Sequence, residues 1–443
     1  MSDCVIELVD SEIRVARGKR VIVRSPGYAV IRAGKTVLGE QALREAHLHP
    51  RDTYNRFWSN LSQDPLQTAA EHVRHHADLA YAHLLSLHEQ AGKPKEVVFA
   101  VPGSYSRDQL ALLLGIAQAC PFAAVGLVDT GVAAASVAAG PGSYLYVDVQ
   151  LHRMLVTRLA VDDMVVRESV ETIENGGLVA IRDTSAELIA DAFIAQCRFD
   201  PLHRAETEQA LFDQLPQYLK TLSERPEVVL EIQFQGNRHQ ARLKQAALLE
   251  RLEARYVEII QRLEPERLPL LSSRAAALPG LADRIPGAHV LEADALFSAC
   301  SVHASIIRST GPDVSFITRL PAPPRPLVTA AGVPPQEQIT ERRDDVPEAV
   351  THLLSGHRAY PLAIAPWFLS AAGGVGRVRE DTTACCVVFN SRQAVVEPLS
   401  DITIYVNGTR LSGKRVLSAG DKISFAGTET VFSLISMVDP DAA

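Results

Sequence analysis

Residues 97–139 read VVFAVPGSYSRDQLALLLGIAQACPFAAVGLVDTGVAAASVAA, and this stretch decides the prediction of the fold. Val97–Val101 is an unbroken apolar run of strand length, which is typical of a strand buried on both faces. Ser106–Cys120 carries apolar residues at helical spacing. A short strand at Gly126–Val128 and an alanine-rich helix at Val132–Ala139 follow. Strands that alternate with helices in this way predict an α/β domain.

Two runs of short strands lie on either side of this stretch, and each predicts a β-meander. The first is expected at Val5–Val9, Glu12–Ala16, Arg20–Arg24 and Tyr28–Arg32, and the second at Tyr144–Asp148, Met154–Leu159 and Met164–Thr172. Helical spacing of apolar residues predicts helices at Pro65–Gln90, Ala186–Gln196, Glu208–Ser223, Gln240–Leu263 and Ala293–Ile307, with strands at Val228–Phe234 and Leu268–Leu271. Because the order of meander, helix and strand occurs twice, residues 1–311 are predicted to form a duplicated α/β domain with two lobes and a cleft between them.

The composition changes at Pro312, where prolines become frequent. A segment this rich in proline is typical of a linker, so residues 312–354 are predicted to join two domains. Residues 355–443 contain short strands with turn signals between them, at Asn407-Gly408 for example. A strand spacing of about 8 to 12 residues predicts an all-β sandwich.

The overall composition excludes several classes of function. A net charge of -8 argues against a nucleic-acid binder, which needs a basic surface. No stretch of about 18 uncharged apolar residues is present, so no membrane partner is expected. The six cysteines are scattered without metal-ligand spacing, which favours reduced thiols in a cytoplasmic protein. His72 and His76 stand four residues apart among other histidines, but no third ligand has the right spacing, so no metal site is predicted.

The stretch 97–139 resembles the strand, helix, strand and alanine-rich helix of the seventy-kilodalton heat-shock chaperones (DnaK type) and their actin-like relatives. That family has a V-P dipeptide after the first strand, as at Val101-Pro102. Its N-E-P-T-A-A-A run is similar to residues 128–134. The turn at residues 35–42, which contains Gly39, is similar to the family's G-x-x-A turn. The resemblance covers about 310 residues and implies an ATPase fold with two lobes.

The same resemblance implies where a nucleotide would bind, and these positions are altered. The family's first phosphate hairpin, D-L-G-T-T, is matched by residues 6–11, IELVDS, in which the acid is Glu7 or Asp10 and the glycine is absent. The second hairpin, D-L-G-G-G-T, is matched by residues 148–153, DVQLHR, which keeps Asp148 but has no glycine. The adenosine loop, G-G-x-x-R-x-P, is matched by residues 272–279, SSRAAALP. The remnant of a cleft therefore consists of Glu7, Asp10, Gly39, Asp148, Arg153, Ser272 and Ser273.

The loss of these glycines has a physical consequence. Glycine lets backbone N–H groups approach phosphate oxygens, and side chains at the same positions fill that space. Losing about three charge-assisted hydrogen bonds, at roughly 1.5 to 3 kcal/mol each, removes millimolar binding. Arg153 is the residue that could still contact a phosphate from the side. We therefore expect no catalytic residues, no cofactor and no enzymatic activity.

Residues 355–443 have a second resemblance, to forkhead-associated domains. Residues 406–411, VNGTRL, and residues 417–423, LSAGDKI, are similar to the family's N-G-x-x-(V/L) and L-x-x-G-D-x-I motifs. Its phosphothreonine site needs a Gly-Arg near the first strand and a Ser-x-x-His pattern. Here residues 361–366 carry no arginine, and residues 382–385 replace the second pattern. Arginine supplies the bidentate charge that makes phosphate binding tight, so none is expected by this route.

Three hypotheses follow for the function. The first is a non-catalytic, chaperone-like scaffold that binds protein partners. The second is a working ATPase of the DnaK type, which would use ATP and Mg²⁺ and which Asp148 supports. The third is an atypical phosphopeptide-binding module that uses another basic residue, such as Arg377 or Arg379.

Overall fold

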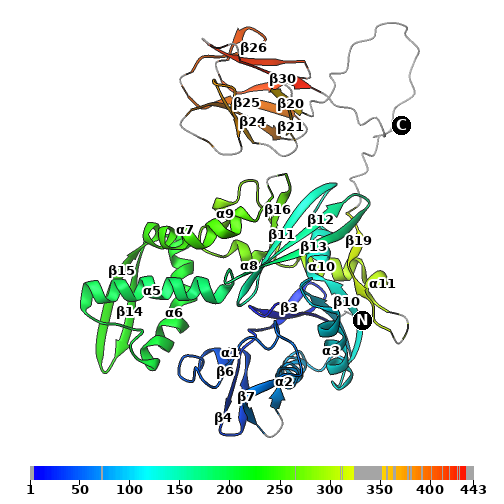
Figure 1. Ribbon diagram of the computed structural model, residues 1–443, viewed down its shortest axis with the longest axis vertical. Coiled ribbons are helices and arrows are strands. Elements are labelled where there is room, and N and C mark those ends of the chain that lie inside the picture. The colour runs from blue at the N-terminus through cyan, green and yellow to red at the C-terminus, as the bar shows by residue number, and fades with distance from the viewer. Residues whose placement is uncertain are drawn as a thin grey trace. The chain divides into compact units, whose positions relative to one another are not determined.

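In the computed structural model, the chain forms two compact units, Met1–Pro326 and Leu327–Ala443. The first unit is mixed α/β, and the described part of the second unit consists of strands (Figure 1). The structure describes residues 4–70, 73–264, 266–309, 311, 313–323, 352–355, 358–362, 366–376, 379, 382–390, 393–400, 402–411, 413–418, 420–426, 428 and 430–435. Within these ranges, no helix has the length and apolar character needed to cross a membrane.

The first unit contains two six-stranded sheets with related strand orders. One has the order β18-β10-β9-β1-β2-β3, in which β1, β2 and β3 form an antiparallel meander and β9 lies parallel to β1. The other has the order β17-β16-β11-β12-β13-β19, in which β11, β12 and β13 form the meander and β16 lies parallel to β11. The bounds in the first sheet are β1 (Cys4–Glu7), β2 (Ile13–Arg17), β3 (Arg20–Ser25), β9 (Glu96–Val101), β10 (Ala123–Asp129) and β18 (Phe316–Ile317). In the second sheet they are β11 (Gly142–Val149), β12 (Arg153–Val161), β13 (Met164–Glu174), β16 (Leu268–Leu271), β17 (His289–Val290) and β19 (Arg319–Pro321).

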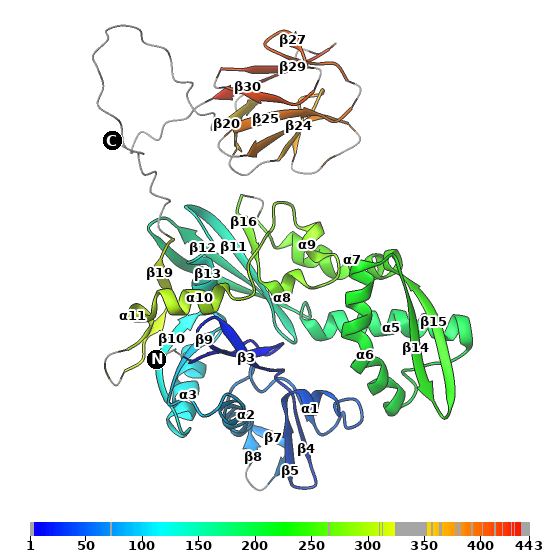
Figure 2. The same cartoon turned by 180° about the vertical axis from the view of Figure 1, so that it is seen from behind.

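Helices and smaller strands connect and cover these sheets (Figure 2). We call the first sheet with its helices lobe one and the second sheet with its helices lobe two. Lobe one also contains β4 (Ala29–Arg32), β5 (Lys35–Leu38), α1 (Gly39–Leu43), β6 (Thr53–Tyr54), β7 (Pro65–Ala70), β8 (Val73–His75), α2 (His76–Gln90), α3 (Arg107–Gln118) and α4 (Thr130–Ala135). Lobe two also contains α5 (Leu178–Cys197), α6 (Ala205–Glu224), β14 (Glu227–Phe234), β15 (Asn237–Lys244), α7 (Gln245–Gln261), α8 (Ser273–Ala276), α9 (Leu281–Arg284), α10 (Ala295–Val302) and α11 (Ala304–Ile307).

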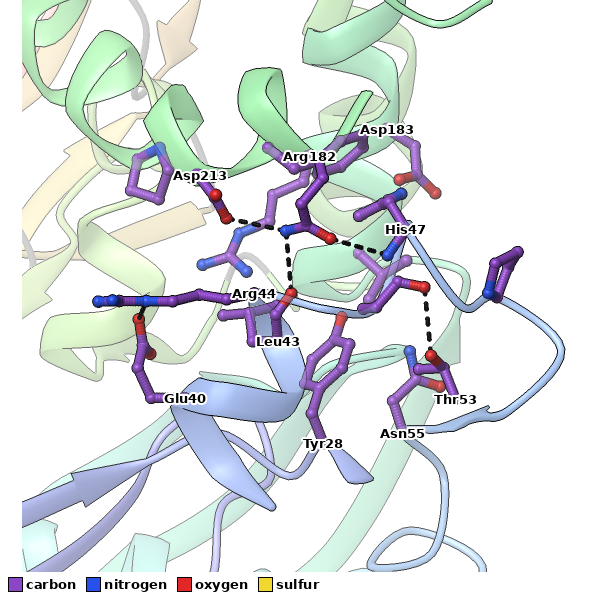
Figure 3. Close-up of a pocket in the computed structure, with 16 residues that line it drawn as sticks. Tyr28, Glu40, Leu43, Arg44, His47, Thr53, Asn55, Arg182, Asp183 and Asp213 are labelled. Atoms are coloured by element: carbon purple, nitrogen blue, oxygen red, sulfur yellow. Dashed lines mark hydrogen bonds and ion pairs between the residues drawn. The ribbon is translucent and has the colours of Figure 1, made fainter. Parts of the chain in front are cut away.

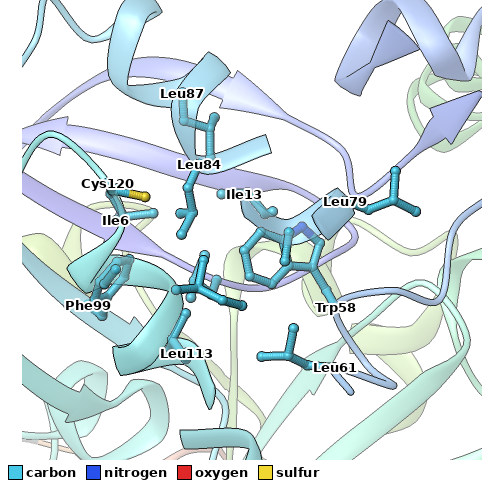
Figure 4. Close-up of a cluster of buried hydrophobic side chains, with 14 of the residues drawn as sticks. Ile6, Ile13, Trp58, Leu61, Leu79, Leu84, Leu87, Phe99, Leu113 and Cys120 are labelled. Carbon is cyan, nitrogen blue, oxygen red and sulfur yellow. The ribbon is translucent and has the colours of Figure 1, made fainter. Parts of the chain in front are cut away.

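Four hydrophobic clusters lie among the described residues of the first unit, the smallest of which packs Leu151 against Tyr28, Val30, Ala42 and Ala46. One joins the first sheet to α2 and α3, and Figure 4 shows its members Ile6, Trp58 and Leu84. A second joins the second sheet to α5, α6, α7 and the β14–β15 hairpin. The third combines residues of both sheets, such as Val98 and Tyr146, with α4 and α10. The shared third cluster fixes the two sheets against each other and so positions the strand ends between them.

Two predicted helices begin later than expected. The helix expected at Pro65–Gln90 is instead a strand pair, β7 and β8, followed by α2 from His76. The side chain of Asp78 accepts the backbone N–H groups of Arg74 and His75 and thereby caps the helix at that point. The helix expected from Gln240 begins at Gln245, because residues 237–244 pair with β14 and bury alternate side chains.

Two further predictions need correction at their ends. The helix expected at Ala293–Ile307 is divided into α10 and α11 at His303, whose backbone leaves the helical conformation. Strands β18 and β19 pair with β10 and β13, so the first unit extends past the boundary at residue 311 that the proline content indicated. The rest of the predicted linker, from residue 324 to residue 351, lies outside the described residues.

The second unit contains two antiparallel sheets. They have the orders β21-β20-β30-β29-β26-β27 and β23-β22-β24-β25-β28. Apolar side chains from both, such as Leu369, Val387 and Phe432, share one buried cluster. The bounds are β20 (His352–Ser355), β21 (Arg358–Pro361), β22 (Trp367–Ser370), β23 (Val375–Gly376), β24 (Thr383–Asn390), β25 (Gln393–Pro398), β26 (Ile404–Val406), β27 (Thr409–Arg410), β28 (Arg415–Leu417), β29 (Lys422–Phe425) and β30 (Val431–Ile435). These short strands agree with the strand-and-turn pattern expected for residues 355–443, as far as the structure describes them.

Candidate functional site

Two buried carboxylates meet between the lobes. Glu7 is the last residue of β1, and Asp148 lies near the end of β11, the corresponding strand of the other sheet. Arg274, from the short helix α8, lies between them. Its Nη2 is 2.8 Å from Glu7 Oε1 and 2.8 Å from Asp148 Oδ2. One guanidinium therefore pairs with Glu7, one of the two candidate acids of the first expected hairpin, and with Asp148 of the second.

A second arginine completes the charge balance. Arg14 of β2 pairs with Glu7 and donates from Nη1 to the carbonyl of Ala293 at 2.8 Å. Burial alone would raise the pKa of Glu7, but the charges of Arg274 and Arg14 outweigh it and lower the pKa to about 2. Burial likewise acts to lower the pKa of Arg274, and Asp148 and Glu7 reverse this and raise it well above the ordinary value. The four groups form a compensated ionic cluster, with Arg14 and Arg274 balancing Glu7 and Asp148.

The space next to Glu7 itself is small, whereas Arg14 and Arg274 also line a neighbouring cavity of about 630 Å³. Ser272 donates its hydroxyl to Asp148 Oδ1 at 2.6 Å and caps α8 by accepting the N–H of Ala275. The cavity lined by Glu7, Arg274 and Ser272 has a volume of about 10 Å³. Such a volume holds at most a single water molecule. A hydrated metal ion with phosphate groups does not fit there without displacement of Arg274.

The helix N-terminus nearest the second hairpin is also occupied by the chain itself. The first helical N–H groups usually lack intrahelical partners and attract anions. In α5, the N–H of Leu178 donates to the carbonyl of Gln150 and that of Val179 to the carbonyl of Leu151. Gly177 permits this approach, because a Cβ atom there would collide with the backbone of His152 and Arg153. The hairpin therefore takes the place that an anion would need.

Asp10 and Arg153 lie beside this hairpin rather than in the ionic cluster. Asp10 accepts the N–H of Leu151 through Oδ1 at 2.8 Å, while its Oδ2 is buried without a hydrogen-bond partner. Burial raises the pKa of Asp10 to about 6. Arg153 donates to Gln150 Oε1 at 2.5 Å and to Ser104 Oγ at 3.3 Å, so its guanidinium already has partners.

Gly39 belongs to a different environment. It begins α1 with a φ of +64°, and a Cβ atom there would collide with the hydroxyl of Ser25. Ser25 in turn bonds His83 Nε2 at 2.8 Å, and Trp58 donates to His83 Nδ1 at 3.1 Å. The glycine thus serves packing beside a buried histidine, and no contact with Glu7 or Asp148 is present among the described residues. Ser273 lies next to Arg274, and its carbonyl accepts the N–H of Ala277, but its hydroxyl makes no hydrogen bond with another described residue.

The lobes also contact each other at a second place, where the segment after α1 packs against α6. His47, after α1, stacks on Phe212 of α6 with ring centroids 3.8 Å apart. The backbone N–H of His47 donates to Gln209 Oε1 at 2.9 Å, and its Nδ1 is 2.9 Å from Glu208. Gln209 also donates to the carbonyl of Leu43. Together with the ionic cluster, these contacts hold the lobes together in two places.

Two histidines of α2 form hydrogen bonds with backbone carbonyl groups. His76 Nδ1 lies 3.0 Å from the carbonyl of Asn60, and His88 Nε2 lies 3.2 Å from that of Pro94. His152 is half-buried, and its Nε2 lies 3.0 Å from Asn55 Oδ1. His72 lies outside the described residues. Within the described ranges, no group of three or more His, Cys, Asp or Glu side chains could hold a metal ion.

The second unit shows how its two motifs are used. Asn407 donates from Nδ2 to Asp421 Oδ1 at 2.6 Å and accepts the N–H of Lys422 at 2.8 Å. The motif residues therefore fasten one turn to another. Arg379 donates to the carbonyl of Leu399 at 3.2 Å, and Arg377 lies outside the described residues.

Sequence reasoning found Glu7, Asp148 and Ser272 but assigned no role to Arg14 or Arg274. One signal was present in the sequence: two carboxylates at the ends of apolar strands need a cation if both are buried. Arg274 follows such a strand, Leu268–Leu271, by three residues. The adjacent glycines Gly176 and Gly177 were also overlooked, although paired glycines before a helix mark a close approach of two backbones.

Comparison with known proteins does not identify the chain. No protein-family model matches it, and no curated protein is similar to it.

Proposed function

We propose that this protein is a non-catalytic, chaperone-like scaffold with a degenerate nucleotide cleft, in which its own arginines pair with the two carboxylates. The observation that carries the proposal is the position of Arg274, which pairs with Glu7 and Asp148 at once. In an ATPase of the chaperone type, carboxylates at these strand ends would act on Mg²⁺ or its water. Here a guanidinium supplies the positive charge, and a metal ion would have to displace it.

The arrangement of the sheets supports an actin-like origin for the first unit. Both sheets place an antiparallel meander beside parallel strands in the same order, and they share one core. We propose that these are duplicated actin-like lobes and that the second unit is a β-sandwich of the forkhead-associated type. In both, the positions that would bind a ligand instead form internal contacts, which favours protein binding over catalysis.

The contacts between the two lobes explain how the protein would work as a scaffold. A working ATPase of this class needs nucleotide to bring its lobes together, whereas here the ionic cluster, the α5 N-terminus and the His47 stack do so without one. A scaffold benefits from such a fixed shape, because a rigid surface loses less entropy when a partner binds.

A thermal-shift titration with Mg²⁺-ATP tests the proposal. A ligand at about 100 times its dissociation constant stabilises the folded state by about 2.7 kcal/mol. We expect no shift with Mg²⁺-ATP or Mg²⁺-ADP at millimolar concentration, and no phosphate release. A saturable shift would establish the alternative, an ATP-binding protein of the DnaK type.

The scaffold role itself is tested by affinity capture of the tagged full-length chain from its native cells. We expect at least one protein partner that remains bound in the presence and absence of Mg²⁺-ATP. Partners that are released by nucleotide would contradict a nucleotide-independent scaffold.

A further inference from the structure

Another cavity lies between the lobes, beside the His47–Phe212 stack. Its volume is about 640 Å³, which is within the range of small-molecule sites. Lobe one contributes Tyr28, which precedes β4, and residues from α1, β6 and the loops around β6. Lobe two contributes residues from the first turns of α5 and from α6 (Figure 3). The polar side chains that face it include Tyr28, Arg44, Asn55, Arg182, Asp183 and Asp213.

Arg182 is the unusual member of this lining. Its side chain is half-buried and extends into the cavity towards Arg44 (Figure 3). Arg44 pairs with Glu40 at 3.3 Å, whereas Arg182 makes no hydrogen bond or ion pair with any residue that the structure describes. Burial lowers the pKa of Arg182, and the weaker attractions of Tyr28, Glu40 and Asp183 do not offset it. A half-buried guanidinium that lines a cavity and has no partner among the described residues is available to pair with an anionic group of a ligand.

The acidic residues of the cavity restrict what that partner can be. Asp213 receives the Gln209 amide on Oδ1 at 2.8 Å, and its Oδ2 makes no contact within the described chain. Asp183 has no hydrogen bond or ion pair there either. Arg44 pairs with Glu40, so their charges cancel. Among the described residues that line the cavity, the guanidinium of Arg182 then faces the carboxylates of Asp183 and Asp213. A polyanion such as a nucleotide triphosphate would be repelled, and a ligand with one negative and one positive group would satisfy both signs.

We propose that this cavity binds a small zwitterion of the amino-acid class. The carboxylate of the ligand pairs with the Arg182 guanidinium in the bidentate manner that arginine favours. The ammonium group is held by the free carboxylate of Asp183 or Asp213, and the Tyr28 hydroxyl lies on the opposite wall. Because the ligand contacts both lobes, its binding further stabilises the closed arrangement. Glu7, Arg14 and Arg274 do not line this cavity, although Arg182 and Pro216 also line the neighbouring cavity beside Arg14 and Arg274.

The experiment is a thermal-shift screen of the full-length protein against the twenty L-amino acids, each at about 10 mM, followed by calorimetric titration of each hit. We expect at least one amino acid to raise the Tm in a saturable way, and its C-terminal amide to fail. Arg182→Gln should weaken the dissociation constant by about tenfold to a hundredfold, as expected for the loss of a charge-assisted pair. Arg251→Gln, which removes an exposed arginine paired with Asp191, is the matched control and should leave binding unchanged.

A structural role for Arg182 is distinguished by the Tm of the ligand-free variants. If Arg182 serves a ligand, Arg182→Gln keeps or raises the Tm of the free protein, since an uncompensated cation has been removed. A lower Tm without ligand, the absence of any hit, or equal binding of the amide would each overturn the proposal.

Discussion

At the scale of single residues, the centre of the first unit contains four charges that only compensate one another. Glu7 and Asp148 are almost fully buried, and their side chains find Arg274 and Arg14 rather than water. A buried ion pair contributes little net stability compared with an apolar pair, but the loss of one partner leaves an uncompensated charge. The cluster is therefore a point at which a single substitution has a large effect.

Arg274→Ala is expected to lower the free energy of unfolding by about 3 to 5 kcal/mol, because it leaves Asp148 buried without a cation and Glu7 with Arg14 alone. Chemical denaturation measures this loss. The same variant should become more stable when Mg²⁺ is added, since the freed carboxylates can then bind a cation. Arg251→Ala is the control, and removal of its exposed ion pair should cost less than about 1 kcal/mol. A loss of similar size in both variants would contradict the central role of Arg274.

Asp10→Asn is expected to stabilise the protein at neutral pH. Burial raises the pKa of Asp10 to about 6, against an ordinary value of 3.8, so the folded state must ionise a group that it disfavours. The cost appears as the pH rises from about 4 to 6 and amounts to about 3 kcal/mol above pH 6. The measurement is the difference in unfolding free energy between variant and wild type. It should be positive at pH 7 and should disappear near pH 4, and a constant difference would contradict the assignment.

His83 produces a pH dependence of the opposite sign. Burial lowers its pKa to about 4, so between about pH 6.5 and 4 the unfolded state binds a proton that the folded state does not. Stability should fall by about 3 kcal/mol as the pH decreases through this range. His83→Gln is expected to be less stable at pH 7, because hydrogen bonds to Ser25 and Trp58 are altered, but to lose this part of the acid sensitivity. Unfolding curves from pH 4 to 7 test it, and an unchanged slope in the variant would refute it.

At the scale of secondary-structure elements, the N-terminus of α5 contacts the β11–β12 hairpin, which is the segment that the sequence matched to a phosphate hairpin. Two helical N–H groups donate to the hairpin carbonyls, and this requires a residue without a side chain at the helix start. The arrangement satisfies donors that a nucleotide-binding protein would reserve for its ligand.

Gly177→Ala is expected to destabilise the first unit by about 3 kcal/mol or more, because the added Cβ would meet rigid backbone. Gly115→Ala is the matched control. Gly115 lies within α3 with open space around it, so alanine there should stabilise by about 0.5 to 1 kcal/mol through its helix propensity. Effects of the same sign in the two variants, measured by denaturation, would disprove the close approach.

At the scale of the whole molecule, the chain consists of two units with separate cores. Differential scanning calorimetry should therefore resolve two transitions. Asn407→Ala should lower the transition of the second unit alone, by about 1 to 3 kcal/mol, because it leaves Asp421 and the Lys422 N–H without their partner. Arg274→Ala should lower only the other transition. A single transition that shifts with both variants would show that the units unfold together.

The sequence by itself determined the local elements. The apolar run at Val97–Val101, the capped helix after Ser106 and the strand Leu268–Leu271 all follow from periodicity and from residue types that act over a few positions. It also showed that the two segments expected to be phosphate hairpins lack glycine, because the absence of a residue type can be read from the sequence alone. Errors arose where a long-range partner decided the conformation, as at residues 240–244, which were expected to be helical but pair with β14.

Only the tertiary structure decided which side chains pair with the buried carboxylates Glu7 and Asp148. Glu7 and Arg274 are 267 positions apart, and nothing local requires them to meet. Their pairing results from two sheets that share a core and bring the ends of β1 and β11 together beside α8. The free guanidinium of Arg182 was hidden for the same reason, since a charge is unpaired only relative to everything around it. Burial and charge compensation are properties of the folded chain, and they exist only when distant segments have come together.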